Sequence, residues 1–283
     1  MSEKKEAAAK KALWRLASRE TREGNTVVRL KGGVEIGGNR LAIIAGPCGV
    51  ESREQLLEAA IGVKRAGAVV LRGSIFKPRT SPYDFQGLGI KATDILADVS
   101  REAGIAVETE VMHPSHVELV EDSVDMLRVG SRNMQNFDLL KEVGKSEKPV
   151  LLKRGFSATI SEFLLAAEYI LNEGNPNVVL CERGIRTFVP ETRNTLDLNA
   201  VPLVKALSHL PIVVDPSHGT GVRELVVPMS KAGIASGADG LMVEVHPRPH
   251  EALSDAAQQL TISEFGRLMD EVGPVARAVG RSL

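Results

Sequence analysis

Two basic side chains, Lys77 and Arg79, stand in the stretch FKPRTSP at positions 76–82, and Arg72 stands shortly before it. Two prolines in the stretch restrict the backbone around these charges. The cations follow an apolar run, so they must either bind anionic groups or face water. By itself the stretch leaves two interpretations open, a rigid cationic site for anionic substrates and a solvated basic loop.

Six basic residues occur where short apolar runs end. They are Arg72, Lys77, Arg79, Arg132, Lys153 and Arg183. If they converge on one site, they repel one another strongly unless anions bind among them. Guanidinium and ammonium groups suit phosphate and carboxylate groups, so we expect substrates that carry several negative charges. A salt bridge at the surface is the alternative for each cation taken alone.

A second set of residues offers metal ligands, namely Cys48, His218, Glu244 and Asp255. A thiolate, an imidazole and two carboxylates form a mixed set that suits Mn, Fe, Co or Zn. These residues are far apart in the sequence, so their spacing does not support a site. The alternatives stay open that Cys48 is a small buried apolar residue and that His218 only ends a strand.

Eight short apolar runs rich in β-branched residues predict the strands that must position these side chains. The runs occupy residues 41–48, 68–76, 106–111, 125–131, 149–155, 177–184, 211–219 and 239–247. Segments with helical periodicity lie between most of them, at residues 53–67, 90–104 and 160–174 for example. Alternating strands and helices predict a parallel sheet, and eight repeats predict a (β/α)8 TIM barrel. A doubly wound open sheet is the competing fold, although no GxGxxG motif follows the first run.

The polar residues gather at the C-terminal ends of the runs, and in a TIM barrel this rim holds the active site. We therefore expect the cations, the metal ligands and Glu110 to meet at one mouth, with His246 close enough to line it. Arg128 lies in the fourth run, where an interior salt bridge is expected. Cys181 and His209 are interpreted as structural residues.

Residues 1–40 are expected to form an extension to a catalytic barrel domain at residues 41–283. Within the extension, the apolar stripe of residues 3–20 predicts a short amphipathic helix. Residues 26–38 predict a β-hairpin, because two short apolar runs flank a Gly-Gly pair.

The composition limits the classes of function. The chain has 283 residues and a net charge of −1, so no global field attracts it to nucleic acid or to a membrane. No apolar run approaches the length of a membrane span, and the charged N-terminus does not resemble a signal peptide. Two cysteines imply no disulfide framework. These features predict a cytoplasmic protein.

Several motifs together resemble the type I-beta group of 3-deoxy-D-arabino-heptulosonate 7-phosphate (DAHP) synthases. They are GPCGVES, RGSIFKPRTSPYDFQGLG, VGSRNMQNF, LLKRG, ERG, DPSHGTG and LMVEVHP, and they span roughly residues 27–270 in one register. KPRTSP combined with GSRNMQN is the most specific part. The resemblance implies a metal-dependent barrel that condenses phosphoenolpyruvate with erythrose 4-phosphate and releases phosphate. That reaction is the first step of the shikimate route to aromatic amino acids.

The resemblance also implies which residues contact the substrates. Arg132, Lys153 and Arg183 would hold the phosphate of phosphoenolpyruvate, with Ser131 as a further substrate-binding residue. Arg72 and Lys77 would lie at its carboxylate and near the reacting carbons. Arg79 and Thr80 would hold the phosphate of erythrose 4-phosphate. FKPRTSP would then serve two anionic substrates side by side.

The resemblance makes Cys48, His218, Glu244 and Asp255 the ligands of a divalent metal ion, Mn among the candidates. It implies that this ion polarises the aldehyde oxygen of erythrose 4-phosphate. Lys77 is the expected proton donor. Glu110 and Asp215 are expected to line the mouth and orient water.

Two other activities and a binding function are the alternatives. The sister enzyme 3-deoxy-D-manno-octulosonate 8-phosphate synthase uses arabinose 5-phosphate and has a KANRSS-type loop where this chain has KPRTSP. Its metal-free members have Asn at the position of Cys48, so Cys48 favours a metal enzyme. A Schiff-base aldolase with Lys153 as nucleophile is a second possibility. A phosphometabolite-binding barrel is the third, but it gives the four candidate ligands no purpose.

Regulation and assembly are further expectations from the resemblance. Longer family members carry an N-terminal ferredoxin-like domain or a fused chorismate mutase, and about 40 residues precede the first barrel strand here. We therefore expect a catalytic core that is insensitive to Phe, Tyr and Trp, unless a separate partner protein confers control. The family forms tetramers or dimers, so a homo-oligomer, for example a homotetramer, is expected.

Overall fold

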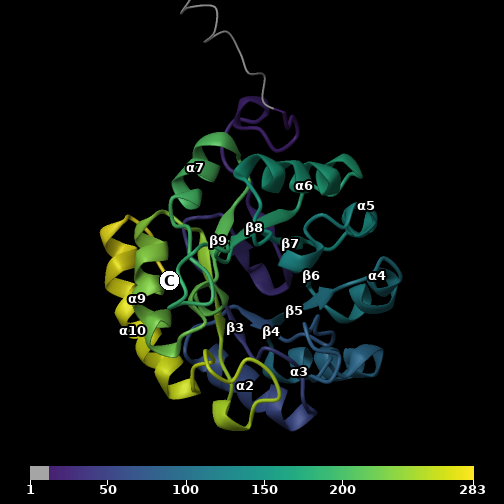
Figure 1. The fold of residues 1–283 in the computed structure, drawn as a ribbon, viewed down its shortest axis with the longest axis vertical. Helices are drawn as coiled ribbons and strands as arrows, with labels where there is room; N and C mark the ends of the chain where they lie inside the picture. The colour runs from purple at the N-terminus through teal and green to yellow at the C-terminus, as the bar shows by residue number, and fades with distance from the viewer. Residues whose placement is uncertain (1–12) are drawn as a thin grey trace, which may run out of the picture.

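Eight parallel strands close into a barrel, and helices surround it (Figure 1). The computed structural model describes residues 13–283. Around the barrel the strands follow the order β10-β3-β4-β5-β6-β7-β8-β9. Their bounds are β3 Ala42–Gly46, β4 Val70–Arg72, β5 Ala106–Val111, β6 Met126–Val129, β7 Val150–Lys153, β8 Val178–Glu182, β9 Ile212–Val214 and β10 Gly240–Glu244. The TIM barrel expected from the alternating pattern is confirmed.

The closure of the barrel depends on the parallel pairing of its last strand with its first. β10 pairs with β3 from Gly240 opposite Ala42 to Glu244 opposite Gly46. A Cβ atom on Gly240 would lie 2.0 Å from the carbonyl oxygen of Ala42, so only glycine permits this approach. The closed order excludes the open doubly wound sheet that was the competing prediction.

Helices follow the strands and cover the outside of the barrel (Figure 1). They are α2 Arg53–Arg65, α3 Thr93–Ala103, α4 Ser115–Val120, α5 Phe137–Lys145, α6 Ile160–Asn172, α7 Ala200–Leu207, α8 Pro216–Thr220, α9 Arg223–Ala235 and α10 Ile262–Ala278. Capping boxes start α6 and α10, where Thr159 and Thr261 pair with Glu162 and Glu264. This T-x-x-E spacing satisfies backbone N–H groups that otherwise lack a partner in the first turn.

A short β-hairpin closes the N-terminal end of the barrel, opposite the strand ends that carry the polar residues. It pairs β1 (Val28–Arg29) with β2 (Glu35–Ile36). Val28 and Ile36 are buried in a cluster with Ala42, Val70 and Met126, which are the first residues of β3, β4 and β6. The hairpin predicted around the Gly-Gly pair is therefore confirmed, and it leaves the opposite end open.

The amphipathic helix predicted over residues 3–20 is only partly testable, since residues 1–12 lie outside the described part of the chain. From residue 13 the prediction is wrong, because turns precede a short 3-10 helix, η1 (Arg19–Thr21). The Glu168 carboxylate accepts the backbone N–H groups of Arg15, Leu16 and Ala17. These contacts to α6 replace the hydrogen bonds that a helix would supply.

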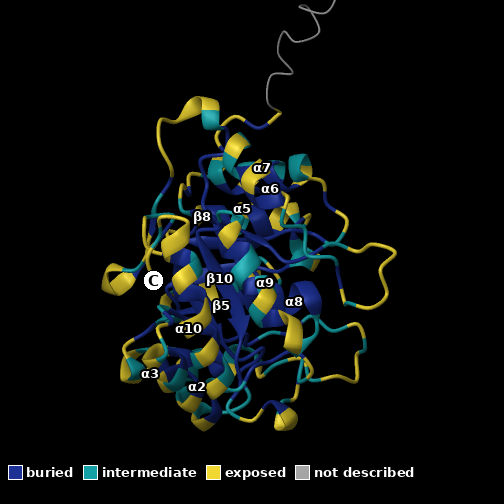
Figure 2. Cartoon of the chain, turned by 90° about the vertical axis from the view of Figure 1, so that its left-hand side faces the viewer, coloured by how far each residue is buried: buried dark blue, intermediate teal, exposed yellow. Residues whose placement is uncertain are grey.

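Burial follows the layers of the barrel: Figure 2 shows buried strands inside helices whose outer faces are exposed. Among residues 13–283 no helix combines the length and the apolar character that crossing a membrane requires. The division into an extension at residues 1–40 and a catalytic domain at residues 41–283 stays a prediction.

Candidate active site at the barrel mouth

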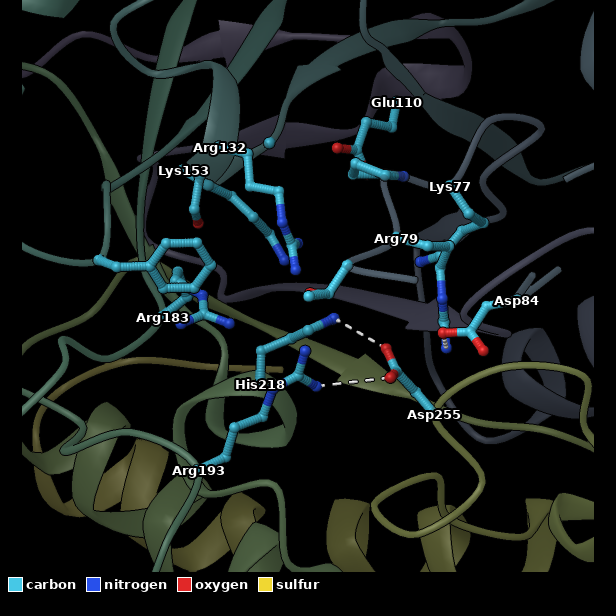
Figure 3. A pocket seen from close by; sticks show the side chains of 15 residues that line it. Lys77, Arg79, Asp84, Glu110, Arg132, Lys153, Arg183, Arg193, His218 and Asp255 are labelled. Atoms are coloured by element: carbon cyan, nitrogen blue, oxygen red, sulfur yellow. Dashed lines mark hydrogen bonds and ion pairs between the residues drawn. The ribbon is translucent and has the colours of Figure 1, made fainter. Parts of the chain in front are cut away.

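A pocket opens at the C-terminal ends of the strands, and ten of the residues singled out from the sequence line it (Figure 3). They are Lys77, Arg79, Thr80, Glu110, Ser131, Arg132, Lys153, Arg183, His218 and Asp255. They come from loops or strand ends after β4, β5, β6, β7, β8, β9 and β10. The barrel brings them together because parallel strands all end on the same rim.

Cys48, Arg72, Asp215 and Glu244 lie beneath this lining and are buried. The Arg72 Nη2 atom is 3.0 Å from Glu244 Oε1. The Lys77 ammonium connects this layer with the pocket, because it donates to the Cys48 sulfur at 2.7 Å. The prediction that Asp215 lines the mouth is wrong: its carboxylate is fully buried behind His218 and Lys153.

The four candidate metal ligands form one cluster. Their ligand atoms all lie within 4.8 Å of one another. The Nε2 atom of His218 is 3.2 Å from Glu244 Oε1 and 3.7 Å from Asp255 Oδ2. Asp255 has φ = 51°, a left-handed conformation that L residues rarely adopt. This backbone holds the Asp255 carboxylate against the cluster, which is the kind of strain that functional sites retain.

The orientation of the His218 ring suits a cation in this cluster. Burial lowers the pKa of His218 to about 4, so the ring is neutral at pH 7. Its Nδ1 lies 2.8 Å from the Asp215 carboxylate and is therefore the donor. The lone pair on Nε2 then faces the oxygens of Glu244 and Asp255, and all three are acceptors. A divalent cation among them would satisfy these atoms.

The thiol of Cys48 fits the same conclusion. Burial and the nearby Glu244 raise the pKa of Cys48 to about 12, so the protein alone keeps it as a thiol. That thiol donates to Asp255 Oδ2 at 3.0 Å. Binding of a metal ion would release this proton, because only the thiolate is a ligand.

One side of the pocket carries cations without carboxylate partners. Arg132 and Arg183 form no ion pair with any carboxylate among residues 13–283, whereas Lys153 is paired with the buried Asp215. Burial lowers the pKa of Arg183 to about 10, which leaves the guanidinium charged at pH 7. Burial and Arg193 lower the pKa of Arg132. Free positive charge in a pocket is the condition that an anionic ligand relieves.

Unpaired donors lie near these cations. Two nitrogens of Arg72, Nε and Nη1, are buried without a hydrogen-bond partner in the described structure, and so is the Ser131 hydroxyl. A buried donor without a partner costs free energy, so these atoms are ready to meet acceptor groups of a ligand.

The other side of the pocket holds Arg79, with Thr80 beside it on the lining. Figure 3 shows Arg79 and Asp84 across the pocket from Arg132, Lys153 and Arg183. The Arg79 Nη2 atom is 3.3 Å from Asp84 Oδ2, a partly exposed pair. The pocket therefore has two cationic walls, and His218 and Asp255 of the cluster line it as well.

Some lining residues were missed from the sequence. Arg193, in the loop after β8, points to Asp255 with 3.4 Å between Nη1 and Oδ1. Phe156, in the loop after β7, also lines the pocket. Neither residue belongs to a strand end, so no periodic pattern could have marked it. Gln258 was also missed: its Nε2 donates to Glu244 Oε2 at 2.8 Å and orients that carboxylate.

Other sequence-based expectations can also be compared with the structure. Arg128 forms the expected interior salt bridge, with Nη1 2.7 Å from Glu108 Oε1. Cys181 is buried in the barrel core, as expected of a structural residue. The expectation that His246 lines the pocket is wrong. Its ring turns away to the loop after β3, with Nε2 3.5 Å from Glu51 Oε2.

Comparisons with known proteins find a matching family and similar chains. The model of the DAHP synthetase I family matches residues 25–277. A phospho-2-dehydro-3-deoxyheptonate aldolase of Thermotoga maritima is 52% identical over 94% of this chain and 79% of its own. A crystal structure from the same organism, described as this aldolase (DAHP synthase), has a TM-score of 0.92 and 50% identity, with 95% of this chain and 79% of that chain covered. A 2-dehydro-3-deoxyphosphooctonate aldolase of Syntrophobacter fumaroxidans is 31% identical over 87% of this chain and 91% of its own.

Proposed function

The chain belongs to the DAHP synthetase I family, and we propose that its barrel mouth condenses phosphoenolpyruvate with erythrose 4-phosphate. It is an aldol-type, carbon–carbon bond-forming transferase, and its product is DAHP, the first intermediate of the shikimate pathway. The observation that carries this proposal is the arrangement of two cationic walls around one cluster of metal ligands. Two anionic substrates need two such walls, and their reaction needs both to lie at the same centre.

Phosphoenolpyruvate binds on the wall of Arg132, Lys153 and Arg183. Arg132 and Arg183 have no carboxylate partner of their own in the described chain, so their guanidinium groups are available to a phosphate. The carboxylate of the same substrate is taken by Arg72, whose Nε and Nη1 atoms are buried and have no hydrogen-bond partner among residues 13–283. The Ser131 hydroxyl is a further free donor on this wall.

Erythrose 4-phosphate binds on the opposite wall. Arg79 and Thr80 hold its phosphate, and within residues 13–283 Arg79 forms an ion pair only with the partly exposed Asp84. The aldehyde then points toward Lys77 and the cluster of Cys48, His218, Glu244 and Asp255. When a divalent ion is bound by these four residues, it supplies Lewis-acid polarisation of the aldehyde oxygen.

The reaction joins the methylene carbon of phosphoenolpyruvate to the carbonyl carbon of the aldose. The new alkoxide takes a proton, for which Lys77 is the donor, since its ammonium lies beside the cluster. Water adds to the electron-poor carbon that carries the phosphate, and loss of inorganic phosphate leaves a 2-keto acid. Glu110 lies on the pocket wall where it can orient that water. Asp215 acts indirectly, because it holds His218 and Lys153 in place.

The sister activity with arabinose 5-phosphate is the second candidate. The relative named for that reaction, from Syntrophobacter fumaroxidans, is 31% identical to this chain, whereas the heptonate aldolase of Thermotoga maritima is 52% identical. A Schiff-base aldolase is poorly supported, because the Lys153 amine that would be its nucleophile is engaged in an ion pair with Asp215. We also propose that the native metal is Mn, Fe, Co or Zn. The assembly is a tetramer or a dimer, and the location is cytoplasmic.

The decisive experiment measures phosphate release from phosphoenolpyruvate with erythrose 4-phosphate or with arabinose 5-phosphate, in the presence of Mn²⁺ and then of EDTA. We expect turnover with the four-carbon sugar and its loss in EDTA. Turnover with only the five-carbon sugar would assign the chain to the sister reaction. Activity that survives EDTA would overturn the metal site at Cys48 and its partners.

A further inference from the structure

One aromatic ring at the pocket is shared by three arginines. Phe156 lies in the loop after β7, and its ring is half-buried. The Cζ atoms of Arg132, Arg183 and Arg186 lie 5.5, 4.6 and 5.1 Å from the centre of this ring. All three distances are within the range of a cation–π contact. Arg132 follows β6, whereas the other two follow β8, so the ring gathers side chains from separate parts of the barrel.

These arginines have little else to hold them. Among the described residues, 13–283, none of the three forms an ion pair with a carboxylate, and the only side-chain hydrogen bond found there runs from Arg183 to the carbonyl of Gly184 at 3.3 Å. The loop that carries Arg186 is fixed to Phe156 itself, because the Arg186 N–H donates to the Phe156 carbonyl at 2.8 Å. Three guanidinium groups this close to one another repel, so the ring is their shared stabilising contact.

An aromatic ring is suited to this position in a way that a carboxylate is not. A carboxylate would hold the guanidinium groups but would also neutralise the charge that an anionic substrate needs. The face of a phenyl ring attracts cations through its quadrupole and carries no net charge. It therefore holds the arginines in place and leaves their positive charge and their N–H groups available to the pocket.

We infer that Phe156 is a positioning residue for the phosphate of phosphoenolpyruvate: its ring holds Arg132 and Arg183 against the pocket, while Arg186 lies against the same ring. This inference rests on the proposed function, because it takes that phosphate to be the ligand of this wall. Phe156 has no part in the chemistry of bond formation. Its contribution is to the binding of one substrate, on one wall of the pocket.

The test compares three variants of the full-length enzyme with a divalent metal present. Phe156→Leu removes the ring and keeps an apolar side chain, whereas Phe156→Tyr keeps the ring. Phe137→Leu is the matched control, because Phe137 is also a partly exposed ring but stacks on Tyr169 at 4.6 Å, in α5 and away from the pocket. The measurements are kcat, KM for each substrate, the melting temperature, and the Kd of phosphoenolpyruvate by calorimetry.

We expect Phe156→Leu to raise KM and Kd for phosphoenolpyruvate about fivefold to tenfold. The values of kcat and of KM for erythrose 4-phosphate should change less than about twofold, and Phe156→Tyr and Phe137→Leu should behave like the unaltered enzyme. An unchanged Kd in Phe156→Leu, or an equal loss in Phe156→Tyr, would overturn the inference. So would a fall in kcat with KM unchanged.

The two proposals fail in different ways. If the unaltered enzyme turns over both substrates and Phe156→Leu binds phosphoenolpyruvate equally well, only the role of Phe156 is refuted. If the unaltered enzyme binds phosphoenolpyruvate without turnover and Phe156→Leu binds it more weakly, only the proposed reaction is refuted. A chain that does not bind phosphoenolpyruvate at all refutes both.

Discussion

The Nδ1 atom of His218 lies 2.8 Å from Oδ2 of Asp215, and the same oxygen accepts a hydrogen bond from the ammonium group of Lys153. One buried carboxylate therefore connects the cluster of candidate metal ligands with the pocket wall formed by Arg132, Lys153 and Arg183. Asp215 also accepts the backbone N–H of His218 through Oδ1, at 2.9 Å. It fixes both the tautomer and the orientation of the imidazole ring, although it does not reach the pocket.

Asp215→Asn is expected to weaken metal binding about tenfold to a hundredfold, which is the usual effect of removing such an orienting partner. The amide has no negative charge to favour the tautomer whose Nε2 lone pair faces Glu244 and Asp255. Competition with a chromophoric chelator would measure the affinity for Mn²⁺ or Zn²⁺. Asp122→Asn, in the short 3-10 helix η4 (Glu121–Ser123), is the control. Equal affinities in the two variants would contradict this role of Asp215.

Arg79→Met is expected to raise KM for erythrose 4-phosphate by about tenfold to a hundredfold, since a charge-assisted contact to phosphate is lost. KM for phosphoenolpyruvate should change little, because Arg132, Lys153 and Arg183 lie across the pocket (Figure 3). Steady-state kinetics with each substrate varied in turn would show the difference. Asp84→Asn is the control, since it removes the partner of Arg79 but keeps the guanidinium. A rise in both KM values would mean that Arg79 supports the whole pocket.

Arg128→Met is expected to lower the free energy of unfolding by about 3–5 kcal/mol. The loss leaves Glu108 as an uncompensated buried charge, and its Oε2 atom already has no hydrogen-bond partner within the described chain. Urea denaturation would measure the change. Arg101→Met is the matched control, because its pair with Asp98 is exposed and is worth at most about 1 kcal/mol. A loss no larger than that of the control would contradict the expected cost of leaving Glu108 as an unpaired buried charge.

His209 is expected to make stability depend on pH. Its Nδ1 lies 2.8 Å from the Thr26 hydroxyl and its Nε2 lies 2.7 Å from the carbonyl of Leu16, so the neutral ring ties the N-terminal segment to the barrel. Burial lowers the pKa of His209 in the folded state. The unfolded chain therefore takes up a proton first as the pH falls. The stabilisation is complete above about pH 6.5 and is lost as the pH falls through the folded-state pKa.

The measurement is the free energy of unfolding of the unaltered protein and of His209→Leu between pH 7.5 and pH 5.5. We expect a difference of about 1–3 kcal/mol at pH 7.5, which narrows as the pH falls. His250→Leu controls for the loss of an exposed histidine, whose side chain is 77% exposed. A difference that stays constant with pH would show that His209 does not titrate in this range.

The sequence determined the architecture, because the apolar periodicity that predicts each strand or helix lies within a short segment of the chain. Each apolar run needs only its own residues to predict a strand, and eight of them predict the closed sheet. It also indicated which charged residues belong to the candidate site, since charged side chains at the C-terminal ends of barrel strands line the active-site rim. The helix predicted over residues 3–20 is wrong from residue 13 onward, because the contact that decides the structure there is not local. There the backbone groups are satisfied by Glu168, a partner that is far away in the sequence.

The tertiary structure alone decided how these charges meet. No spacing relates Cys48 to Asp255, or Asp215 to Lys153, because their distances depend on strands that close around the barrel. For the same reason the sequence did not mark Phe156, whose three arginines come from the ends of two other strands. It placed Asp215 and His246 in the pocket, whereas packing turned both away. The sequence specifies the type of each side chain, whereas the fold decides how deeply a side chain is buried and which other side chains lie beside it.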